Sequence, residues 1–416
     1  MFSNLNDKKI LYLNDRHEEK DTQNEDRRKL YDKRILSLLT ENDLAIFGQK
    51  ANSFLWDYYK SLGMAGIRKD NIFYVKNFLE YSSLTKAVLD NSSLIRQIKE
   101  KKPDVILPYI ESHNSQILAQ KINCLTLRDA EGVEQINNKS EYRQIIKELG
   151  FSLVPAFRVN NLKEAGGKFD VLKESGFKKI MIKKERSVAG FGIFIIKTKQ
   201  ELNKQVGENF SQESSFLLEG FIEDVKGSPN IQYWISPTEI KLIVLSDQLF
   251  EEDRISHQGN IFPSWVDKNS IILEKIKKLS FKICDYLQKK KMYGMVGIDY
   301  LITKDDKIYS TEINARLNAS TFAALVVNEL FGLNDKFFWK TFSLKGYLLP
   351  FEVLFNYSRK IFIKQKGDFG IFPIDIGILD SLGEGQFIAI GSNLGQVNSY
   401  IKEIRRIYEN LFEGKM

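Results

Sequence analysis

The chain has 416 residues, of which 43% are hydrophobic and 28% are charged, a composition typical of a globular protein with several domains. Its 61 basic and 54 acidic side chains leave a formal charge of +7, too small for this length to indicate binding to nucleic acid. Two cysteines and three scattered histidines exclude a disulfide scaffold and argue against a histidine-bound metal. No apolar run approaches the ~18 residues of a membrane span. Because no signal peptide is recognisable either, we expect a cytoplasmic protein that does not bind membranes.

The first part of the chain alternates short β-rich runs with helical patterns. The expected strands are Ile10–Leu13, Leu44–Phe47, Ile72–Val75, Val105–Pro108 and Cys124–Leu127, with helices between them such as Ser53–Leu62 and Leu94–Lys102. This alternation predicts a Rossmann-like α/β domain with a parallel sheet over residues 1–132. No Gly-x-Gly-x-x-Gly motif follows any of these runs, so a dinucleotide site is not predicted.

From Asn137 onwards the pattern changes to α+β with antiparallel hairpins. Asn138 and Lys139 begin a helix that ends at Gly150, a residue typical of helix C-termini. Further strands are expected at Leu153–Val159, Lys179–Lys183, Ile193–Ile196, Phe216–Leu218, Gly297–Ile302 and Ile308–Ile313, and helices at Leu162–Ser175 and Ser270–Lys289. We assign residues 133–345 to one domain, with lobes at about 133–222 and 223–345.

The last residues, 346–416, are predicted to form a small α+β unit. Its expected strands are Lys360–Ile363, Gly370–Ile374 and Phe387–Ile390, and Leu394–Tyr408 has the pattern of a closing amphipathic helix. The chain contains neither an internal repeat nor a low-complexity tract.

A loop of small residues joins two of the expected strands. Ser187, Gly190 and Gly192 belong to this loop, and Lys183 precedes it. Glycines let backbone N–H groups approach phosphates closely, and the lysine can neutralise phosphate oxygens. A hairpin with a flexible turn and an exposed lysine would have the same pattern, so the loop alone does not decide its function.

Two carboxylates thirteen residues apart, Asp299 and Glu312, lie on two strands joined by a tight turn. The hairpin would place them side by side. Asn314 and Arg316 are two and four residues after Glu312, so their side chains would point to the same face of the strand. Two carboxylates and an amide oxygen suit Mg²⁺ that also binds substrate phosphates, and Arg316 could hold a phosphoryl oxygen. We favour this hypothesis over an acidic hairpin face with a surface arginine.

An apolar strand runs from Phe216 into Glu219, Gly220, Phe221, Ile222 and Glu223. Backbone groups of such a segment can contact the edge of an adenine, and Glu223 could accept hydrogen bonds from a ribose. The same residues could also be only the end of a core strand.

Taken in this order, the three segments resemble the ATP-grasp superfamily over about Lys139 to Glu329, preceded by a domain similar to the pre-ATP-grasp domain. The resemblance implies that ATP lies between two α+β lobes. The residues that it assigns to ATP are Lys139, Lys183, Ser187, Gly190, Gly192, Glu219, Gly220, Phe221, Ile222 and Glu223. It further implies that Asp299, Glu312 and Asn314 bind one or two Mg²⁺ ions, for which Mn²⁺ can substitute.

Shorter segments, such as Ser228–Gln232 and Gly259–Pro263, are similar to those of pheganomycin-type peptide ligases. Related proteins include amino-acid ligases that load a carrier protein. Two positions depart from the wider pattern. Ala315 stands where many superfamily members have proline, and Gly297 stands where D-alanine–D-alanine ligases have arginine.

The sequence therefore predicts an ATP- and Mg²⁺-dependent ligase that activates the carboxylate of an amino acid or peptide as an acyl phosphate for attack by an amine, in natural-product biosynthesis. Lys183 and Arg316 are the predicted catalytic residues, and Arg254, His257 and Arg316 the predicted substrate contacts. Two alternatives stay open: transfer to the thiol of an acyl carrier protein, and an ATP-binding protein without ligase activity. The sequence does not indicate an oligomeric state.

Overall fold

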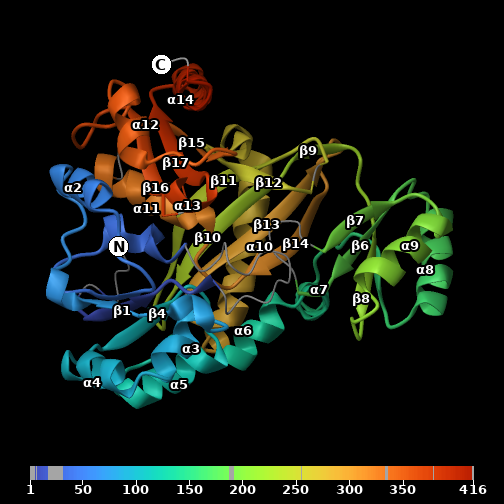
Figure 1. Ribbon diagram of the computed structural model, residues 1–416. Helices are drawn as coiled ribbons and strands as arrows, with labels where there is room; N and C mark the ends of the chain where they lie inside the picture. Colours follow the sequence, from blue (N-terminus) through green and yellow to red (C-terminus); the bar gives the residue numbers. More distant parts are fainter. Residues whose placement is uncertain are drawn as a thin grey trace.

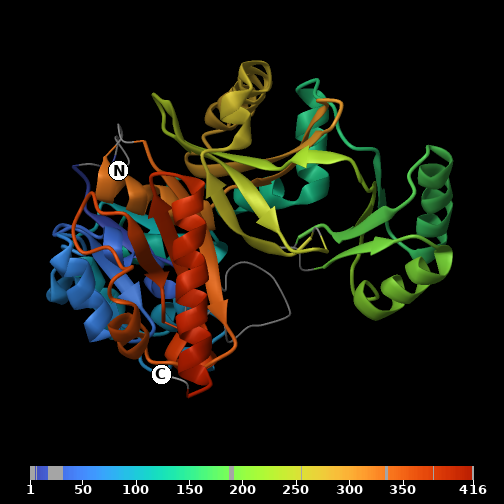
Figure 2. The same cartoon turned by 90° about the horizontal axis from the view of Figure 1, so that it is seen from above.

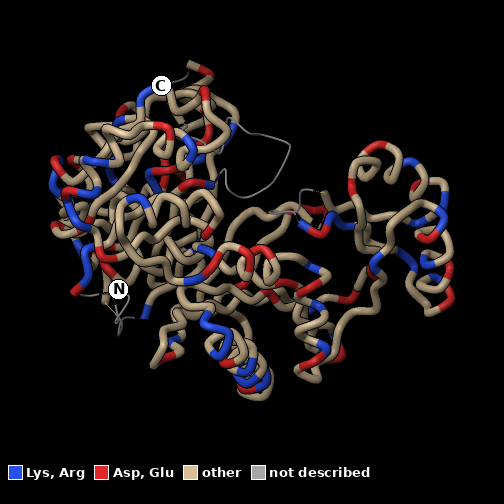
Figure 3. The backbone as a smooth tube through the Cα atoms, turned by 90° about the horizontal axis from the view of Figure 1, so that it is seen from below, with Lys and Arg blue, Asp and Glu red and all other residues tan. Residues whose placement is uncertain are grey.

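The computed structural model describes residues 5, 7–16, 31–186, 192–253, 255–332, 336–377 and 379–414. Within these ranges the strands form three sheets, of four, nine and four strands (Figure 1). Acidic and basic side chains are interspersed along the backbone, as expected for a small net charge (Figure 3). No helix in the described ranges is both long and apolar enough to cross a membrane.

The N-terminal sheet is parallel and has the order β3-β2-β1-β4. Its elements are β1 (Ile10–Leu13), η3 (Asp32–Leu38), β2 (Leu44–Phe47), α2 (Ser53–Ser61), η4 (Lys69–Asn71), β3 (Ile72–Tyr74), η5 (Phe78–Glu80), α3 (Leu84–Leu89), α4 (Ser92–Glu100), β4 (Val105–Pro108) and α5 (His113–Ile122). The predicted parallel sheet is confirmed. The fifth predicted strand, Cys124–Leu127, is wrong: only Leu125 pairs, by one bridge to Val105. The Leu125 side chain is 69% exposed, so no buried face holds a longer strand at this edge.

Two helices, α6 (Ala130–Asn137) and α7 (Lys139–Glu148), lead into a small antiparallel sheet of order β5-β8-β6-β7. Its elements are β5 (Ala156–Val159), α8 (Leu162–Glu174), β6 (Ile180–Lys184), β7 (Ile193–Ile196), α9 (Lys199–Asn209) and β8 (Phe216–Gly220). We call residues 156–220 the small lobe. Its two helices pack on one face of the sheet, and the lobe projects from the rest of the molecule (Figures 1 and 2).

The nine-stranded sheet has the order β14-β13-β10-β11-β12-β15-β17-β16, and β9 also pairs with β13. Its elements are β9 (Val225–Gly227), β10 (Pro229–Ile235), β11 (Ile240–Phe250), β12 (His257–Phe262), η6 (Trp265–Lys268), α10 (Ser270–Lys289), β13 (Gly294–Thr303), β14 (Ile308–Asn314), α11 (Ala319–Phe331), β15 (Phe338–Lys345), α12 (Phe351–Ser358), β16 (Gly370–Asp375), α13 (Leu379–Leu382), β17 (Glu384–Gly391) and α14 (Leu394–Phe412). Helix α14 lies against β15 and β17 (Figure 2).

The sheet continues past residue 345, so the C-terminal unit and the unit before it share one sheet. The domain boundaries given above stay a prediction. The predicted strand Lys360–Ile363 is wrong, because only Phe362 pairs, by one bridge to Ile371. Ile361, Phe362 and Ile363 are all buried, so this segment fills the core instead of turning one face to a partner strand.

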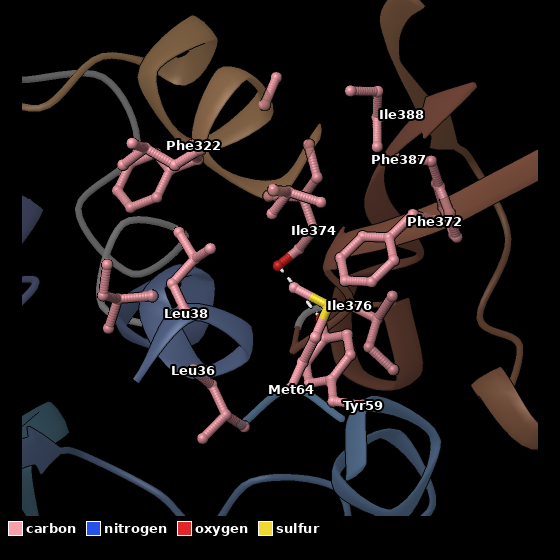
Figure 4. Packing of buried hydrophobic residues seen from close by; sticks show 14 of the residues in the cluster. Leu36, Leu38, Tyr59, Met64, Phe322, Phe372, Ile374, Ile376, Phe387 and Ile388 are labelled. Atoms are coloured by element: carbon pink, nitrogen blue, oxygen red, sulfur yellow. Dashed lines mark hydrogen bonds between the residues drawn. The ribbon is translucent and has the colours of Figure 1, made fainter. Parts of the chain in front are cut away.

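One hydrophobic core joins the N-terminal unit to the C-terminal half of the nine-stranded sheet. Leu38 lies toward Phe322 there, and Tyr59 lies beside Phe372 (Figure 4). The rings of Tyr59 and Phe372 stack with their centroids 5.2 Å apart, and the Tyr59 hydroxyl donates to the carbonyl oxygen of Pro373 at 2.7 Å. The N-terminal unit is therefore fixed against the strands that follow residue 345.

Candidate active site

A cavity of about 860 Å³ lies between the small lobe, the nine-stranded sheet and the N-terminal unit. Lys183 and Glu219 line it from the small lobe, Asp299 and Glu312 from the sheet, and Tyr109 from the N-terminal unit. Ligand pockets usually measure ~300–1,000 Å³, so this cavity has the size of a site for a nucleotide-sized ligand.

The β13–β14 hairpin places the predicted carboxylates side by side. Asp299 is paired directly with Glu312, and Gly297 with Asn314. The Asn314 side-chain Nδ2 donates to Asp299 Oδ2 at 2.9 Å and to Glu312 Oε1 at 3.3 Å. The structure thus brings all three predicted metal ligands together, as their spacing predicts.

A buried polar network supports Asp299 from the neighbouring strand β10. Asn230 pairs with Asp299 in register and donates from Nδ2 to Asp299 Oδ1 at 2.5 Å. Gln232 donates to Asn230 Oδ1 at 2.9 Å, and the Ser320 hydroxyl donates to the same oxygen at 3.2 Å. No role at the site was predicted for Asn230 or Gln232 from the sequence. Two polar residues two positions apart in an otherwise apolar strand were the signal available.

The two carboxylates have opposite pKa shifts. Burial, followed by the negative charge of Glu312, raises the pKa of Asp299. Burial opposes ionisation of Glu312 as well, but the charge of Lys139 and the hydrogen bond from Asn314 outweigh it and lower the pKa of Glu312. A cation between the two groups would relieve their repulsion.

Oxygen ligands of this kind fit Mg²⁺, which commonly binds one or two carboxylates together with substrate phosphates. The described residues contain no cluster of three histidine, cysteine, aspartate or glutamate side chains that could hold a metal. A metal site here therefore depends on oxygens from a bound ligand besides Asp299 and Glu312, and on the Asn314 amide oxygen, which accepts a hydrogen bond from Arg316 in this structure.

Both predicted phosphate-binding lysines lie at the cavity wall and bind carboxylates. Lys139 Nζ is 3.2 Å from Glu312 Oε2, and Lys183 Nζ is 2.5 Å from Glu219 Oε1. Arg143 NH1 also contacts Glu219, at 2.7 Å from Oε2. The Glu219 side chain thus pairs two cations.

The segment after Glu219 lines the cavity with Gly220, Phe221 and Ile222. The Gly220 backbone N–H donates to the Pro155 carbonyl oxygen and the Phe221 N–H to the Lys179 carbonyl oxygen, both at 3.0 Å. These two N–H groups are therefore already engaged within the protein.

The remaining predicted contacts do not share one location. Glu223 is not among the lining residues and pairs with Lys179 at 2.9 Å, and Gly192 lies at a turn outside the lining. Ser187, Gly190 and Arg254 lie outside the described residues. His257 does line the cavity, with Nε2 3.2 Å from Asn260 Oδ1, and burial lowers its pKa.

Two asparagines hold Arg316 beside the three predicted metal ligands, Asp299, Glu312 and Asn314, which we call the metal set. Its NH2 donates to Asn314 Oδ1 at 2.8 Å, and its NH1 donates to Asn318 Oδ1 at 2.6 Å. A Cβ added at Gly297 would lie 2.5 Å from Asn318 Nδ2, so the glycine makes room for Asn318. Because position 297 is a glycine, Asn318 can stand where it accepts the hydrogen bond that holds Arg316.

Comparison with known proteins gives a consistent result. Residues 136–320 match the family model described as the ATP-grasp domain. The formate-dependent phosphoribosylglycinamide formyltransferase of Ignicoccus hospitalis is 22% identical over 253 residues, covering 58% of this chain and 61% of that relative. The match thus spans about three fifths of that protein's length.

Solved structures show the same fold over nearly the whole chain. An ADP complex of N5-carboxyaminoimidazole ribonucleotide synthetase has a TM-score of 0.63 at 11% identity, covering 97% of each chain. The biotin carboxylase domain of Hydrogenobacter thermophilus 2-oxoglutarate carboxylase, in complex with MgADP and bicarbonate, has a TM-score of 0.60 at 14% identity, covering 98% of this chain and 95% of the other.

Residues 136–320 are thus an ATP-grasp domain, and a parallel α/β domain precedes it. The fold of the chain as a whole is that of the ATP-grasp enzymes to which it is similar. The resemblance to the ATP-grasp superfamily and the predicted fold class are confirmed.

Proposed function

We propose that this protein is an ATP- and Mg²⁺-dependent ligase that activates a carboxylate as an acyl phosphate and joins it to an amine. The observation that carries the proposal is the arrangement of the cavity. The set Asp299, Glu312 and Asn314 lies with Lys139, Lys183 and Arg316 around one space, within an ATP-grasp domain. The structural relatives include complexes with ADP and with MgADP, which supports a nucleotide in this space.

In the first step an oxygen of the substrate carboxylate attacks the γ-phosphorus of ATP. The bond to the β,γ-bridging oxygen breaks, ADP leaves, and an acyl phosphate remains. Such transfer depends on positioning and on neutralisation of charge rather than on a protein nucleophile. Lys139 and Lys183 exchange their carboxylate partners, Glu312 and Glu219, for phosphate oxygens. Asp299, Glu312 and Asn314 would hold Mg²⁺, which would supply further positive charge to the phosphate groups.

In the second step the amine nitrogen attacks the carbonyl carbon of the acyl phosphate. The nitrogen loses a proton to the solvent, and phosphate leaves with one oxygen of the original carboxylate. Arg316 lies beside the metal set, where its guanidinium can donate to the oxyanion that forms on the carbonyl. Loss of one such donor usually slows a reaction by roughly 10²–10³-fold.

Within this class we propose an amino acid or a peptide as a substrate. Support comes from the segments similar to peptide ligases and from His257, which lines the cavity. The names of the relatives refer to formate and to carboxyaminoimidazole ribonucleotide, so one fold serves different substrate pairs. The side chains at the far end of the cavity would then determine the pair.

The experiment follows the carboxylate oxygens. Candidate acids labelled with ¹⁸O in the carboxylate are incubated with ATP, Mg²⁺ and amines, and ADP, phosphate and products are measured by mass spectrometry. We expect one labelled oxygen in the released phosphate and an amide product. A label that stays entirely in the organic product contradicts carboxylate activation, and a stable phosphorylated product indicates a kinase.

The matched variants are Glu312→Gln and Glu274→Gln. Glu312→Gln keeps the shape but removes one charge of the metal set, so ADP release should fall by at least ~10²-fold. Glu274 lies on α10 with its side chain 75% exposed, and its variant should release ADP at the wild-type rate. Near-normal turnover of Glu312→Gln would overturn the metal assignment.

A further inference from the structure

The cavity extends beyond Arg316 to a wall to which the sequence analysis gave no role. Arg16 follows β1 and Tyr109 follows β4, and both line this wall. The strand order β3-β2-β1-β4 reverses its direction between β1 and β4. In open parallel sheets, ligands bind outside the carboxyl ends of the strands at such a reversal. The wall therefore occupies a place where this kind of sheet forms a binding crevice.

Two tyrosine rings on this wall are surrounded by three guanidinium groups. The Cζ atoms of Arg16 and Arg34 lie 4.9 and 4.4 Å from the centre of the Tyr31 ring. Those of Arg16 and Arg316 lie 5.6 and 5.5 Å from the centre of the Tyr109 ring. The ring faces attract the cations and keep them close together despite their equal charge. We call Arg16, Tyr31, Arg34 and Tyr109 the arginine–tyrosine subsite.

Side chains from the C-terminal strands fix this subsite from the opposite side. The Tyr31 hydroxyl donates to Glu384 Oε1 at 2.9 Å, and Arg34 NH2 donates to Gln386 Oε1. Arg34 Nε also lies 3.5 Å from Asp375 Oδ2, and both of these side chains are buried. These contacts give the aromatic and cationic groups a rigid arrangement before any ligand binds, which lowers the entropy lost on binding.

The charged side chains that line this end of the cavity are mostly cationic. Among the residues that the structure describes, Arg16, Arg34, Arg316 and Lys345 line this side together with the carboxylate of Glu384, and Asp375, which pairs with Arg34, is not part of the lining. Arginine binds carboxylate and phosphate groups through two parallel hydrogen bonds. The chemistry of this wall thus suits an anionic group and not a cationic one.

Resting on the proposed function, we propose that the arginine–tyrosine subsite binds an anionic group, a carboxylate or a phosphate, that the amine substrate carries away from its reacting nitrogen. Arg316 touches both regions, because it contacts Tyr109 on one side and Asn314 on the other. A substrate anchored by its anionic end has its amine directed toward Arg316 and the metal set. Binding energy from this remote group then contributes to the alignment of the reacting atoms.

The test uses wild type, Arg16→Gln and the control Arg96→Gln, whose side chain is exposed on α4. Calorimetry first measures the affinity for MgADP, which tests the nucleotide site alone. With MgADP saturating, each protein is then titrated with two matched pairs, glycine against glycinamide and phosphoethanolamine against ethanolamine. Wild type and Arg96→Gln should bind an anionic member at least about tenfold more tightly than its partner, the usual strength of a charged hydrogen bond. Arg16→Gln should reduce this preference to less than about threefold.

The outcomes separate the two proposals. If none of the proteins binds MgADP, the proposed function fails. If MgADP binds but neither pair is discriminated, or Arg16→Gln discriminates as well as wild type does, the subsite is wrong. A preference confined to one pair supports the subsite and identifies carboxylate or phosphate as its ligand. If Arg16→Gln does not fold, Arg16→Lys and Tyr109→Leu replace it. Each should lower a tenfold preference for the anionic member to about threefold or less.

Discussion

The small lobe and the N-terminal unit are attached to the nine-stranded sheet in different ways. The N-terminal unit shares a continuous hydrophobic core with that sheet, which includes Tyr59, Phe322 and Phe372. The buried residues of the small lobe form a cluster of their own, all between Val159 and Leu218. Breaking an apolar interface exposes its whole area to water, at about 25 cal/mol per Å². The first attachment is therefore rigid, whereas the second leaves the lobe free to be repositioned.

Helix α7 shows how the second attachment is made. Tyr142 and Ile146 are buried in the core on the α10 side of the nine-stranded sheet. Other residues of α7 make polar contacts with the small lobe: Ser140 donates to the Glu185 carboxylate, and Arg143 pairs with Glu219. Hydrogen bonds exchange with water at a net cost of only about 1 kcal/mol each. One helix is thus anchored by apolar packing and still carries a lobe on replaceable polar contacts.

The strongest test of this difference removes a side chain from the shared core. Phe372→Ala should lower the free energy of unfolding by ~3–5 kcal/mol, because it leaves a cavity beside Tyr59. Hydrogen exchange should show β1 and β17 losing protection together, since both depend on this core. The control Phe281→Ala lies at an exposed position and should cost little. If β1 and β17 open independently, the core does not join the two units.

A smaller effect is expected where the small lobe meets α7. Glu185 accepts hydrogen bonds from Ser140 and Ser215 and pairs with Arg158 at 2.7 Å. Burial opposes its charge, but these hydrogen bonds and the charge of Arg158 lower its pKa. Glu185→Gln should weaken the contact by ~1–3 kcal/mol.

The measurement is again hydrogen exchange. Protection in β6 and β8 should fall in Glu185→Gln, while protection in β1 and β17 stays at the wild-type level. Glu208→Gln, on the exposed side of α9, is the matched control. Equal losses in the small lobe and in the shared core would contradict the distinction drawn between the two attachments.

The smallest expected effect is a pH dependence at the cavity wall. Burial lowers the pKa of His257, so the folded protein favours the neutral imidazole. The stabilisation is complete above the unfolded pKa of about 6.5 and is lost as the pH falls through the lower folded value. The free energy of unfolding should therefore decrease from pH 7 to pH 5, and His257→Gln should make this decrease less steep. The control is His113→Gln, at an exposed position. If the free energy of unfolding falls with pH as steeply in His257→Gln as in this control, the assignment is refuted.

The parts of the site that could be predicted from the sequence are those whose residues lie close together along the chain. Asp299, Glu312 and Asn314 follow from strand alternation across one short turn, and they meet as expected. Asn230 and the subsite residues Arg16 and Arg34 come from distant segments, and only tertiary packing brings them to the cavity.

The two strand predictions that were wrong, Cys124–Leu127 and Lys360–Ile363, failed for a related reason. An apolar run such as Lys360–Ile363 shows that a segment is buried, but it does not show what the segment pairs with. In the N-terminal sheet, by contrast, four short, largely buried strands alternate with helical segments, and this repeated alternation predicts the pairing as well as the burial.

The close approach of β13 to Asn318 restricts how these positions can change in evolution. A methyl group at Gly297 would displace the amide that accepts a hydrogen bond from Arg316. Substitutions at 297 and 318 are thus expected to be compensatory: a larger residue at the first position is tolerated only with a smaller one at the second. Homologues that change one of the two should change the other, and those that do will orient the arginine by a different route.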